Sequence, residues 1–283
     1  MKWLLALWAL LATPALAAPG LWVVRDADTE ISIFGTVHAL PKGEQWQSPA
    51  LLARLDAADT LVLEAIIPAD PFELAPLVAQ IGTRPGLKPL SERVAKDKAP
   101  RLFAAAALTR LPLPALDRME SWLAAITLGE AALSSLGISA TSGVEPALEK
   151  RARAANKAVI GLETPEQQLR YLDNLPDADQ TAMLEATLDD LAAAREQTDA
   201  VIALWRAGDV DTIARDFAQE ADASPLLMKV LITDRNARWA DWIAGVMKRP
   251  GKVFVAVGSA HLGGPEGLLA LLKARGLVVE KVE

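Results

Sequence analysis

Three short apolar runs, at residues 61–66, 158–162 and 253–258, constrain the fold of this chain most. They read LVLEAI, AVIGL and VFVAVG, without the alternation of apolar and polar residues that marks a half-exposed strand. Such runs are typical of strands in a parallel sheet that is covered on both faces. Because helical patterns separate the runs, we expect an α/β fold with a mixed, largely parallel sheet flanked by helices.

Two flanking segments complete the expected sheet. Residues 21–35, LWVVRDADTEISIFG, predict a hairpin of two short strands around a polar turn, and residues 277–282, LVVEKV, predict a last strand. Most of the remaining chain has helical patterns, several of them bounded by proline near the start or glycine near the end. These patterns cover residues 48–58, 71–82, 91–110, 118–136, 145–156, 165–173, 178–207, 209–221, 225–248 and 265–275.

The block from about residue 165 to residue 250 has no strand signal. We expect a helical insertion there, either a cap packed on the sheet or a bundle-like subdomain. No Ser/Gly-rich linker separates this block from its surroundings. Residues 18–283 are therefore expected to form a single domain.

The first 17 residues have the layout of a cleavable signal peptide. Lys2 precedes an apolar run, and the small-x-small ending Ala15-Leu16-Ala17 follows it. The run is shorter than the roughly 20 residues that cross a bilayer. We expect cleavage after Ala17 and a periplasmic or secreted mature chain without stable membrane insertion; a retained N-terminal anchor is the alternative.

Composition excludes several classes of protein. The chain has no cysteine, so an exported form has neither disulfides nor a site for a lipid anchor. The formal net charge is −7, and the basic residues are mixed with acidic ones along the chain. Nucleic-acid binding needs a clustered basic excess, so no nucleic-acid partner is expected. The motifs GxSxG, GxGxxG and GxxxxGK[ST] are absent as well.

The two histidines of the chain share one local pattern. His38 and His261 each come three residues after a glycine, Gly35 or Gly258, that ends a predicted strand. A histidine in this position projects from the carboxyl edge of the sheet, where open α/β sheets bind ligands. Glu64 lies near the end of the 61–66 strand, and a parallel sheet would bring it to the same edge. We therefore expect His38, Glu64 and His261 to converge on one site.

Two imidazoles and a carboxylate suit a divalent metal ion such as Zn²⁺, Mn²⁺, Co²⁺ or Fe²⁺, with open positions for water and substrate. A water molecule bound to the metal could then act as the nucleophile. The alternative is a structural role, in which each histidine caps a backbone carbonyl and Glu64 pairs with an arginine.

A resemblance to a known family rests on the order of five segments. GTVH comes first, then LVLEA, GVEPALEKRARAANKAVIGLETPEQQ and DRNARWADWI, and last the block from Val253 to the C-terminus. This order resembles the TraB/GumN family, which includes pheromone-shutdown proteins and is similar to the Tiki metalloproteases. The family is also related to erythromycin-esterase-like and haem-handling domains. The resemblance implies an active site of histidine and glutamate.

The resemblance also assigns roles to single residues. His38 and His261 match the motif histidines, and Glu64 matches the strand-end glutamate. Glu145, in the segment GVE, is either a further metal ligand or only a cap of the following helix. Arg235, in the segment DRN, is expected to hold a carboxylate or a developing oxyanion, or else to be an ion-paired structural residue. Two residues beside the AVIGL run, Lys157 and Glu163, are expected to frame that strand.

Three functions follow from these observations. The first is an exported metal-dependent hydrolase that acts on peptide bonds, as the Tiki resemblance implies. The second is a metal-free hydrolase in which one histidine is the general base, with an ionisation expected at about pH 6 to 7. The third is a non-catalytic protein that binds a peptide or another small ligand.

Overall fold

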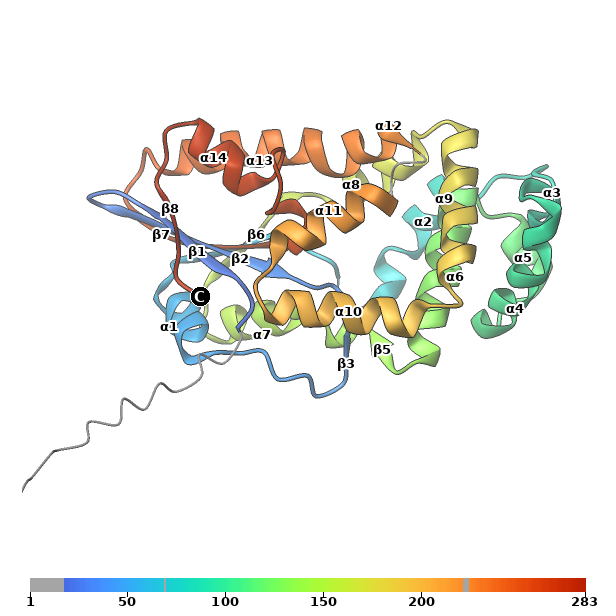
Figure 1. Cartoon of the computed structure of the whole chain (residues 1–283), viewed down its shortest axis with the longest axis horizontal. Helices are drawn as coiled ribbons and strands as arrows, with labels where there is room; N and C mark the ends of the chain where they lie inside the picture. Colours follow the sequence, from blue (N-terminus) through green and yellow to red (C-terminus); the bar gives the residue numbers. More distant parts are fainter. Residues whose placement is uncertain (1–17, 69, 221–223) are drawn as a thin grey trace, which may run out of the picture.

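The computed structural model describes residues 18–68, 70–220 and 224–283. Its centre is a six-stranded sheet with the strand order β6-β4-β7-β2-β1-β8 (Figure 1). The strands of this sheet are β1 (Leu21–Arg25), β2 (Thr29–Thr36), β4 (Thr60–Ala65), β6 (Ala158–Glu163), β7 (Gly251–Gly258) and β8 (Val279–Lys281). Neighbours among β6, β4, β7 and β2 are parallel, whereas β1 is antiparallel to both β2 and β8. The predicted mixed, largely parallel sheet and the predicted hairpin are both confirmed.

Helices lie on both sides of the sheet (Figure 1). The α-helices are α1 (Pro49–Ala57), α2 (Ala75–Gly82), α3 (Leu90–Arg93), α4 (Ala99–Thr109), α5 (Leu113–Asp117), α6 (Ser121–Ser135), α7 (Val144–Ala154), α8 (Pro165–Asp173), α9 (Asp177–Asp190), α10 (Ala194–Arg206), α11 (Val210–Glu220), α12 (Pro225–Met228), α13 (Asp234–Val246) and α14 (Leu268–Ala274). Apolar residues of α1, α7 and α10 pack against one face of the sheet, and those of α13 and α14 pack against the other.

The central strands are buried on both faces because their side chains alternate between two apolar clusters. In β7, Phe254 and Ala256 face the helices α1, α7 and α10, whereas Val255 and Val257 face α13 and α14. The prediction that each apolar run forms a strand covered on both faces is wrong for β6. This strand lies at the sheet edge, where no further strand or helix covers it fully, and the side chain of Ile160 is 40 % exposed.

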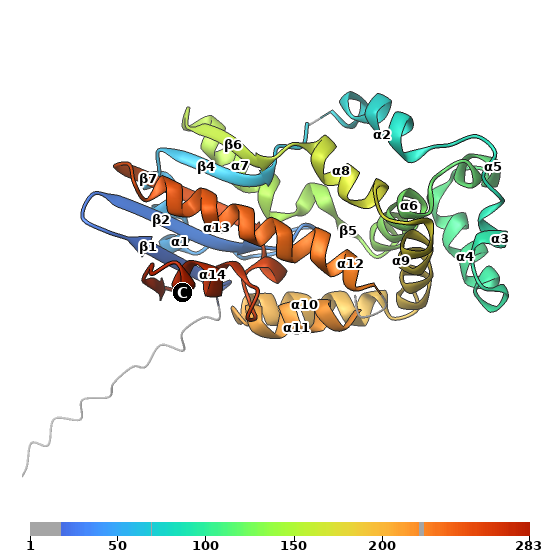
Figure 2. The same cartoon turned by 90° about the horizontal axis from the view of Figure 1, so that it is seen from above.

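A helical lobe extends beyond the carboxyl ends of the strands (Figure 2). It is built from two chain segments, one that contains α2 to α6 and one that contains α9, and buried leucines of α6 and α9 pack together. Only part of the 165–250 block therefore belongs to this lobe. The helices α10 and α13 return to the sheet and supply its core with Trp205 and Trp239.

Two long predicted helices are broken in the structure. The 91–110 pattern is divided into α3, the 3-10 turn η2 (Lys96–Lys98) and α4. The break lies at Val94 and Ala95, whose backbones are extended, and α4 begins with Pro100 in its first turn, where a proline is tolerated because no N–H is needed there. The 178–207 pattern turns at residues 191–193, because α9 packs in the lobe while α10 packs under the sheet.

The predicted signal peptide, residues 1–17, lies outside the described residues. Within the part of the chain that the structure describes, no helix combines the length and the apolar character that a membrane span requires.

Candidate active site

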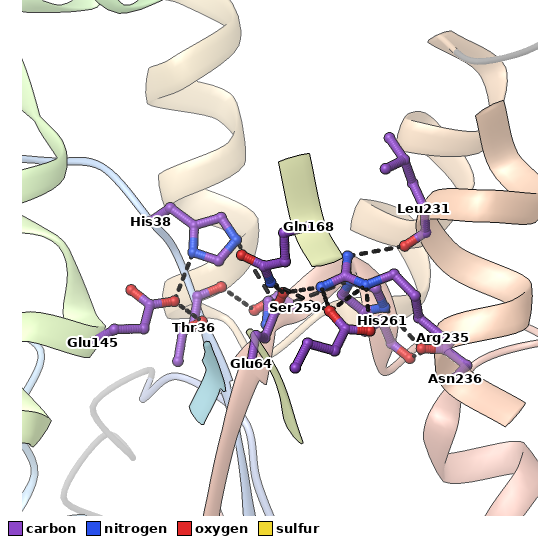
Figure 3. Close-up of polar contacts among 12 residues, drawn as sticks. Thr36, His38, Glu64, Glu145, Gln168, Leu231, Arg235, Asn236, Ser259 and His261 are labelled. Carbon is purple, nitrogen blue, oxygen red and sulfur yellow. Dashed lines mark hydrogen bonds and ion pairs between the residues drawn. The ribbon is translucent and has the colours of Figure 1, made fainter. Parts of the chain in front are cut away.

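The carboxyl ends of three parallel strands bring together His38, Glu64 and His261 (Figure 3). His38 follows β2, Glu64 lies in β4, and His261 ends the 3-10 turn η6 (Ser259–His261) after β7. The Oε1 atom of Glu64 lies 4.0 Å from Nε2 of His38 and 3.8 Å from Nε2 of His261. The predicted convergence of the three side chains is therefore found in the structure.

The last residue of β7, Gly258, borders the space between these three side chains. Its N–H donates a hydrogen bond to Oε1 of Glu64 over 2.7 Å. A Cβ atom at Gly258 would lie 3.2 Å from that oxygen, 3.3 Å from Nε2 of His38 and 3.6 Å from Cδ2 of His261. Glycine at this position therefore keeps open the small space that the three side chains surround.

Glu145, in the first turn of α7, orients the ring of His38. Its Oε1 atom lies 2.7 Å from Nδ1 of His38 and also accepts a hydrogen bond from the hydroxyl of Thr36. The close approach of α7 depends on Gly143, because a Cβ atom there would lie 2.1 Å from the carbonyl oxygen of His38. Glu145 therefore contacts the side of the imidazole that faces away from Glu64.

The contact with Glu145 changes the protonation of His38. Partial loss of hydration at the ring opposes its charged form, but the charge and hydrogen bond of Glu145 and the charge of Glu64 outweigh this effect and raise the pKa of His38 to about 9. Burial alone would raise the pKa of Glu145, yet the charge and hydrogen bond of His38 hold it below its usual range. At neutral pH the pair is an imidazolium beside a carboxylate.

His261 has a different protonation state because it is buried. Its Nδ1 atom lies 2.7 Å from Oδ1 of Asn236, and the amide nitrogen of Asn236 donates to the backbone carbonyls of His261 and Glu266. The acceptor at Nδ1 requires that this nitrogen carries the proton, so Nε2 has the free lone pair. Burial lowers the pKa of His261 to about 3, against the opposing charge of Glu64. The ring also packs on Trp239, with the ring centroids 4.5 Å apart.

Arg235, in α13, connects the strand ends through buried ion pairs. Its Nη2 atom lies 2.5 Å from Oε2 of Glu64 and 2.9 Å from Oε2 of Glu163, at the end of β6. Nη1 donates to the carbonyl of Leu231 and lies 3.1 Å from Nε2 of His261. The carboxylates that Arg235 holds therefore belong to the chain itself, as in the ion-paired alternative.

The same charges control Glu64. Burial alone would raise the pKa of Glu64, but His261, His38 and Arg235 and the hydrogen bond from Gly258 together lower it to about 2. Glu64 is thus ionised at every pH at which the chain is expected to work.

The donor atoms do not fit a metal ion in the arrangement described. A metal bound by Glu64 and both histidines would need the lone pair on Nε2 of His261, but Nη1 of Arg235 already lies against it. The guanidinium also places a positive charge beside the position that a cation would take. Within residues 18–68, 70–220 and 224–283, no group of three or more histidine and acidic side chains is arranged to hold a metal ion. Metal binding stays a prediction, and it requires that Arg235 release His261.

The site includes several side chains for which no site role was expected from the sequence. Glu163 ends its strand as Glu64 does, and this shared position was the signal that could have identified it. The others come from the helices α8 and α13. The amide of Gln168 lies 3.4 Å from both Glu64 and Glu163, and the hydroxyl of Tyr171 donates to Glu163 over 3.2 Å. Arg238 lies one helical turn after Arg235 and contacts Tyr171.

Comparison with known proteins yields a family model and two relatives. The model of the TraB/PrgY/gumN family matches residues 20–281. The uncharacterized protein YbaP of Escherichia coli (strain K12) is 26% identical over 275 residues, which cover 94% of this chain and 97% of that protein. YbaP of Shigella flexneri matches with the same identity and coverage. No solved structure matches the chain significantly.

Proposed function

The chain belongs to the TraB/PrgY/gumN family, and from that membership and the geometry of the site we propose that it is a hydrolase in which His38 transfers protons and Glu145 holds its ring. One observation carries this proposal. The Nδ1 atom of His38 is held by Glu145 over 2.7 Å, while its Nε2 atom lies 4.0 Å from Oε1 of Glu64 on a side chain that is 65 % exposed. A carboxylate on one imidazole nitrogen orients the ring and leaves the other nitrogen to exchange a proton with the reactants.

In the proposed reaction, Nε2 of His38 accepts a proton from water as the water oxygen bonds to the acyl carbon of a peptide or small-molecule substrate. The bond from that carbon to the leaving group then breaks, and His38 returns the proton to the leaving group. The carboxylate of Glu145 stabilises the imidazolium between these two steps. General base catalysis of this kind contributes on the order of 10²- to 10⁴-fold in rate.

The remaining predicted residues are proposed to position His38 and to shape the site. Glu64 is fixed by the N–H of Gly258 and by Arg235. His261 is fixed by Asn236 and stays neutral. Arg235 is 8 % exposed, and its hydrogen bonds go to groups of the chain itself, so it is a positioning residue in this proposal.

The pH dependence of hydrolysis tests this proposal. Because the pKa of His38 is about 9, the fraction of His38 in the base form rises about tenfold for each unit by which the pH increases toward that value. We expect kcat/KM on a pool of N-acetylated peptides to rise with slope one up to about pH 9, rather than to level off at pH 6 to 7 as the unperturbed histidine would. His38→Ala should abolish this rise. Glu149→Gln, which removes an acidic side chain of α7 that pairs with Arg153 and leaves both histidines in place, serves as the control. A pH-independent rate, or full activity in His38→Ala, would contradict the proposal.

A metal-dependent hydrolase is the second candidate, because Oε1 of Glu64 lies within 4.0 Å of both imidazole Nε2 atoms. Metal content and activity after dialysis against a chelator separate the two candidates. The proton-transfer dyad predicts unchanged activity. Activity that is lost with the metal and returns when Zn²⁺, Mn²⁺, Co²⁺ or Fe²⁺ is added would favour the metal-dependent enzyme. A chain that binds peptides without any turnover would instead be the non-catalytic binding protein.

Export forms part of the same proposal. The layout of residues 1–17 supports a signal peptide with cleavage after Ala17 and a periplasmic or secreted mature chain. N-terminal sequencing of the protein from the periplasm and the medium tests it. The expected first residue is Ala18, and a cytoplasmic product that starts at Met1 would contradict export.

A further inference from the structure

Three carboxylates of the site are buried, whereas two of its basic side chains are exposed to solvent. The side chains of the three carboxylates Glu64, Glu145 and Glu163 are 8 %, 17 % and 4 % exposed. The side chains of His38 and Arg238 are 65 % and 51 % exposed. A molecule that enters the site therefore meets an imidazolium and a guanidinium, whereas the carboxylates lie behind them and are already paired.

Arg238 is held in a defined position although half of it is exposed. Its Nη2 atom donates to the hydroxyl of Tyr171 over 2.8 Å and lies 3.5 Å from Oε1 of Glu163. The guanidinium groups of Arg238 and Arg235 both lie over the ring of Tyr171, at 5.5 Å and 5.8 Å from its centroid. A guanidinium fixed on one side keeps its remaining N–H groups for a ligand and loses little side-chain entropy on binding.

The two exposed cations lie at opposite ends of the site. His38 follows β2, whereas Arg238 contacts Glu163 at the end of β6, and β7 and β4 lie between these strands. Three strand spacings correspond to roughly 14 Å, and the distance between the two side chains is shorter because Nε2 of His38 reaches to 4.0 Å from Glu64 on β4. An extended peptide covers this distance with at most about four residues.

We propose that Arg238 binds the carboxylate of the substrate, and that the substrates are peptides whose free C-terminal carboxylate lies at most about four residues from the bond at His38. This inference rests on the proposed hydrolase and names the substrate class of its site. The planar guanidinium suits a carboxylate because it can donate two parallel hydrogen bonds. Tyr171 is the positioning residue that holds Arg238.

Binding at pH 6 tests the inference without dependence on hydrolysis, because the base form of His38 is scarce there. The probes are two pools of N-acetylated tetrapeptides of the same random sequence, one with a free C-terminal carboxylate and one with a C-terminal amide. Calorimetric titration of the full mature chain should show that the acid pool binds about tenfold more tightly than the amide pool, or better. Arg238→Gln should remove this preference, and Arg238→Lys should keep part of it because the charge remains.

Arg153→Gln is the matched control, because Arg153 is 54 % exposed and pairs with Glu149 on α7, away from the site. It should keep the full preference for the acid pool. Equal affinity for the two pools, including no measurable affinity for either, would overturn the inference, and so would a preference that survives in Arg238→Gln. A failure of the proposed hydrolase would instead appear in the pH–rate experiment and leave this comparison of affinities unchanged.

Discussion

Nδ1 of His38 lies 2.7 Å from Oε1 of Glu145, although one residue follows β2 and the other begins α7, 107 positions later. Gly143 makes this contact possible, because its missing side chain lets α7 approach the backbone of His38. The pair gives the site its proposed proton-transfer group, and it should control the ionisation of His38.

Magnetic resonance can follow this ionisation directly, since the natural chain has only two histidines. We expect one imidazole signal to titrate at about pH 9, for His38, and the other to stay neutral down to about pH 3, for His261. Glu145→Gln removes the charge that favours the imidazolium, so it should move the first titration toward the usual value of about 6.5. The second signal should not move. A titration of His38 that is unchanged by Glu145→Gln would show that the dyad does not form.

The two histidines should give the stability of the chain a maximum near pH 6.5. The folded-state pKa of His38 is raised to about 9, so its contribution is complete below about 6.5 and is lost as the pH rises through 9. The folded-state pKa of His261 is lowered to about 3, so its contribution is complete above about 6.5 and is lost as the pH falls toward 3. Glu64, with a pKa of about 2, adds to the loss in acid below its usual pKa.

Urea unfolding at pH 5, 6.5 and 8.5 measures how the free energy of unfolding changes with pH on the acid and the alkaline side of this maximum. His38→Ala should flatten the alkaline side only, and a variant in which the acid side flattens instead would contradict the assignment of the two pKa values.

Gly258→Ala should block the site without removing any of its polar groups. The added methyl group would occupy the space between His38, Glu64 and His261, at 3.2 Å to 3.6 Å from their atoms. The backbone of Gly258 has φ −52°, which alanine adopts without strain, so the variant should fold. We expect hydrolysis to fall by at least about 10²-fold, since small displacements of reacting groups carry such a cost.

Gly245→Ala in α13 is the matched control for this variant, because a Cβ atom there meets no neighbour within 4 Å. It should leave activity unchanged and stabilise the helix by up to about 1 kcal/mol. Circular dichroism should confirm that Gly258→Ala is folded. Full activity in the folded variant would show that the reaction does not take place between His38, Glu64 and His261.

The sequence predicted the strand-end residues of the site because their placement follows from local pattern. Apolar strands followed by Gly-x-x-His, and a glutamate near a strand end, locate His38, Glu64 and His261 at one edge once the sheet is parallel. The contact partners could not be predicted in this way. Whether Glu145 caps α7 or touches His38 depends on how closely the helix approaches, which is set by Gly143 and the packing around it.

Residues on α8 and α13 were harder to place than those on the strands. Tyr171 and Arg238 lie on amphipathic helices. The sequence pattern of such a helix does not distinguish an arginine or a tyrosine of a functional site from one on an ordinary surface helix. They meet only because both helices pack beside the end of β6. The edge position of β6 could not be predicted for a similar reason. AVIGL is as apolar as the buried strands, and the strand order depends on the whole sheet rather than on one segment.

Arg235→Ala should destabilise the folded chain strongly, because Glu64 and Glu163 would lose the buried counter-charge that they share. Both carboxylates and the guanidinium are at most 8 % exposed. Removal of one partner from a buried ion pair costs about 3–5 kcal/mol, mainly through the uncompensated charge that remains. Urea unfolding at pH 7 measures this loss, and the exposed Arg153→Ala should change stability little.

A second substitution shows whether charge or packing causes the loss. Glu163→Gln in the Arg235→Ala background removes one of the two unpaired carboxylates, so the double variant should be more stable than Arg235→Ala alone. Arg235→Lys should lie between Arg235→Ala and the natural chain, because an ammonium keeps the charge but cannot reproduce the forked contacts with Glu64 and Glu163. If Glu163→Gln instead adds its own cost to that of Arg235→Ala, the guanidinium stabilises the fold by packing on Trp239, 4.6 Å from its ring centroid, and not by neutralising the carboxylates.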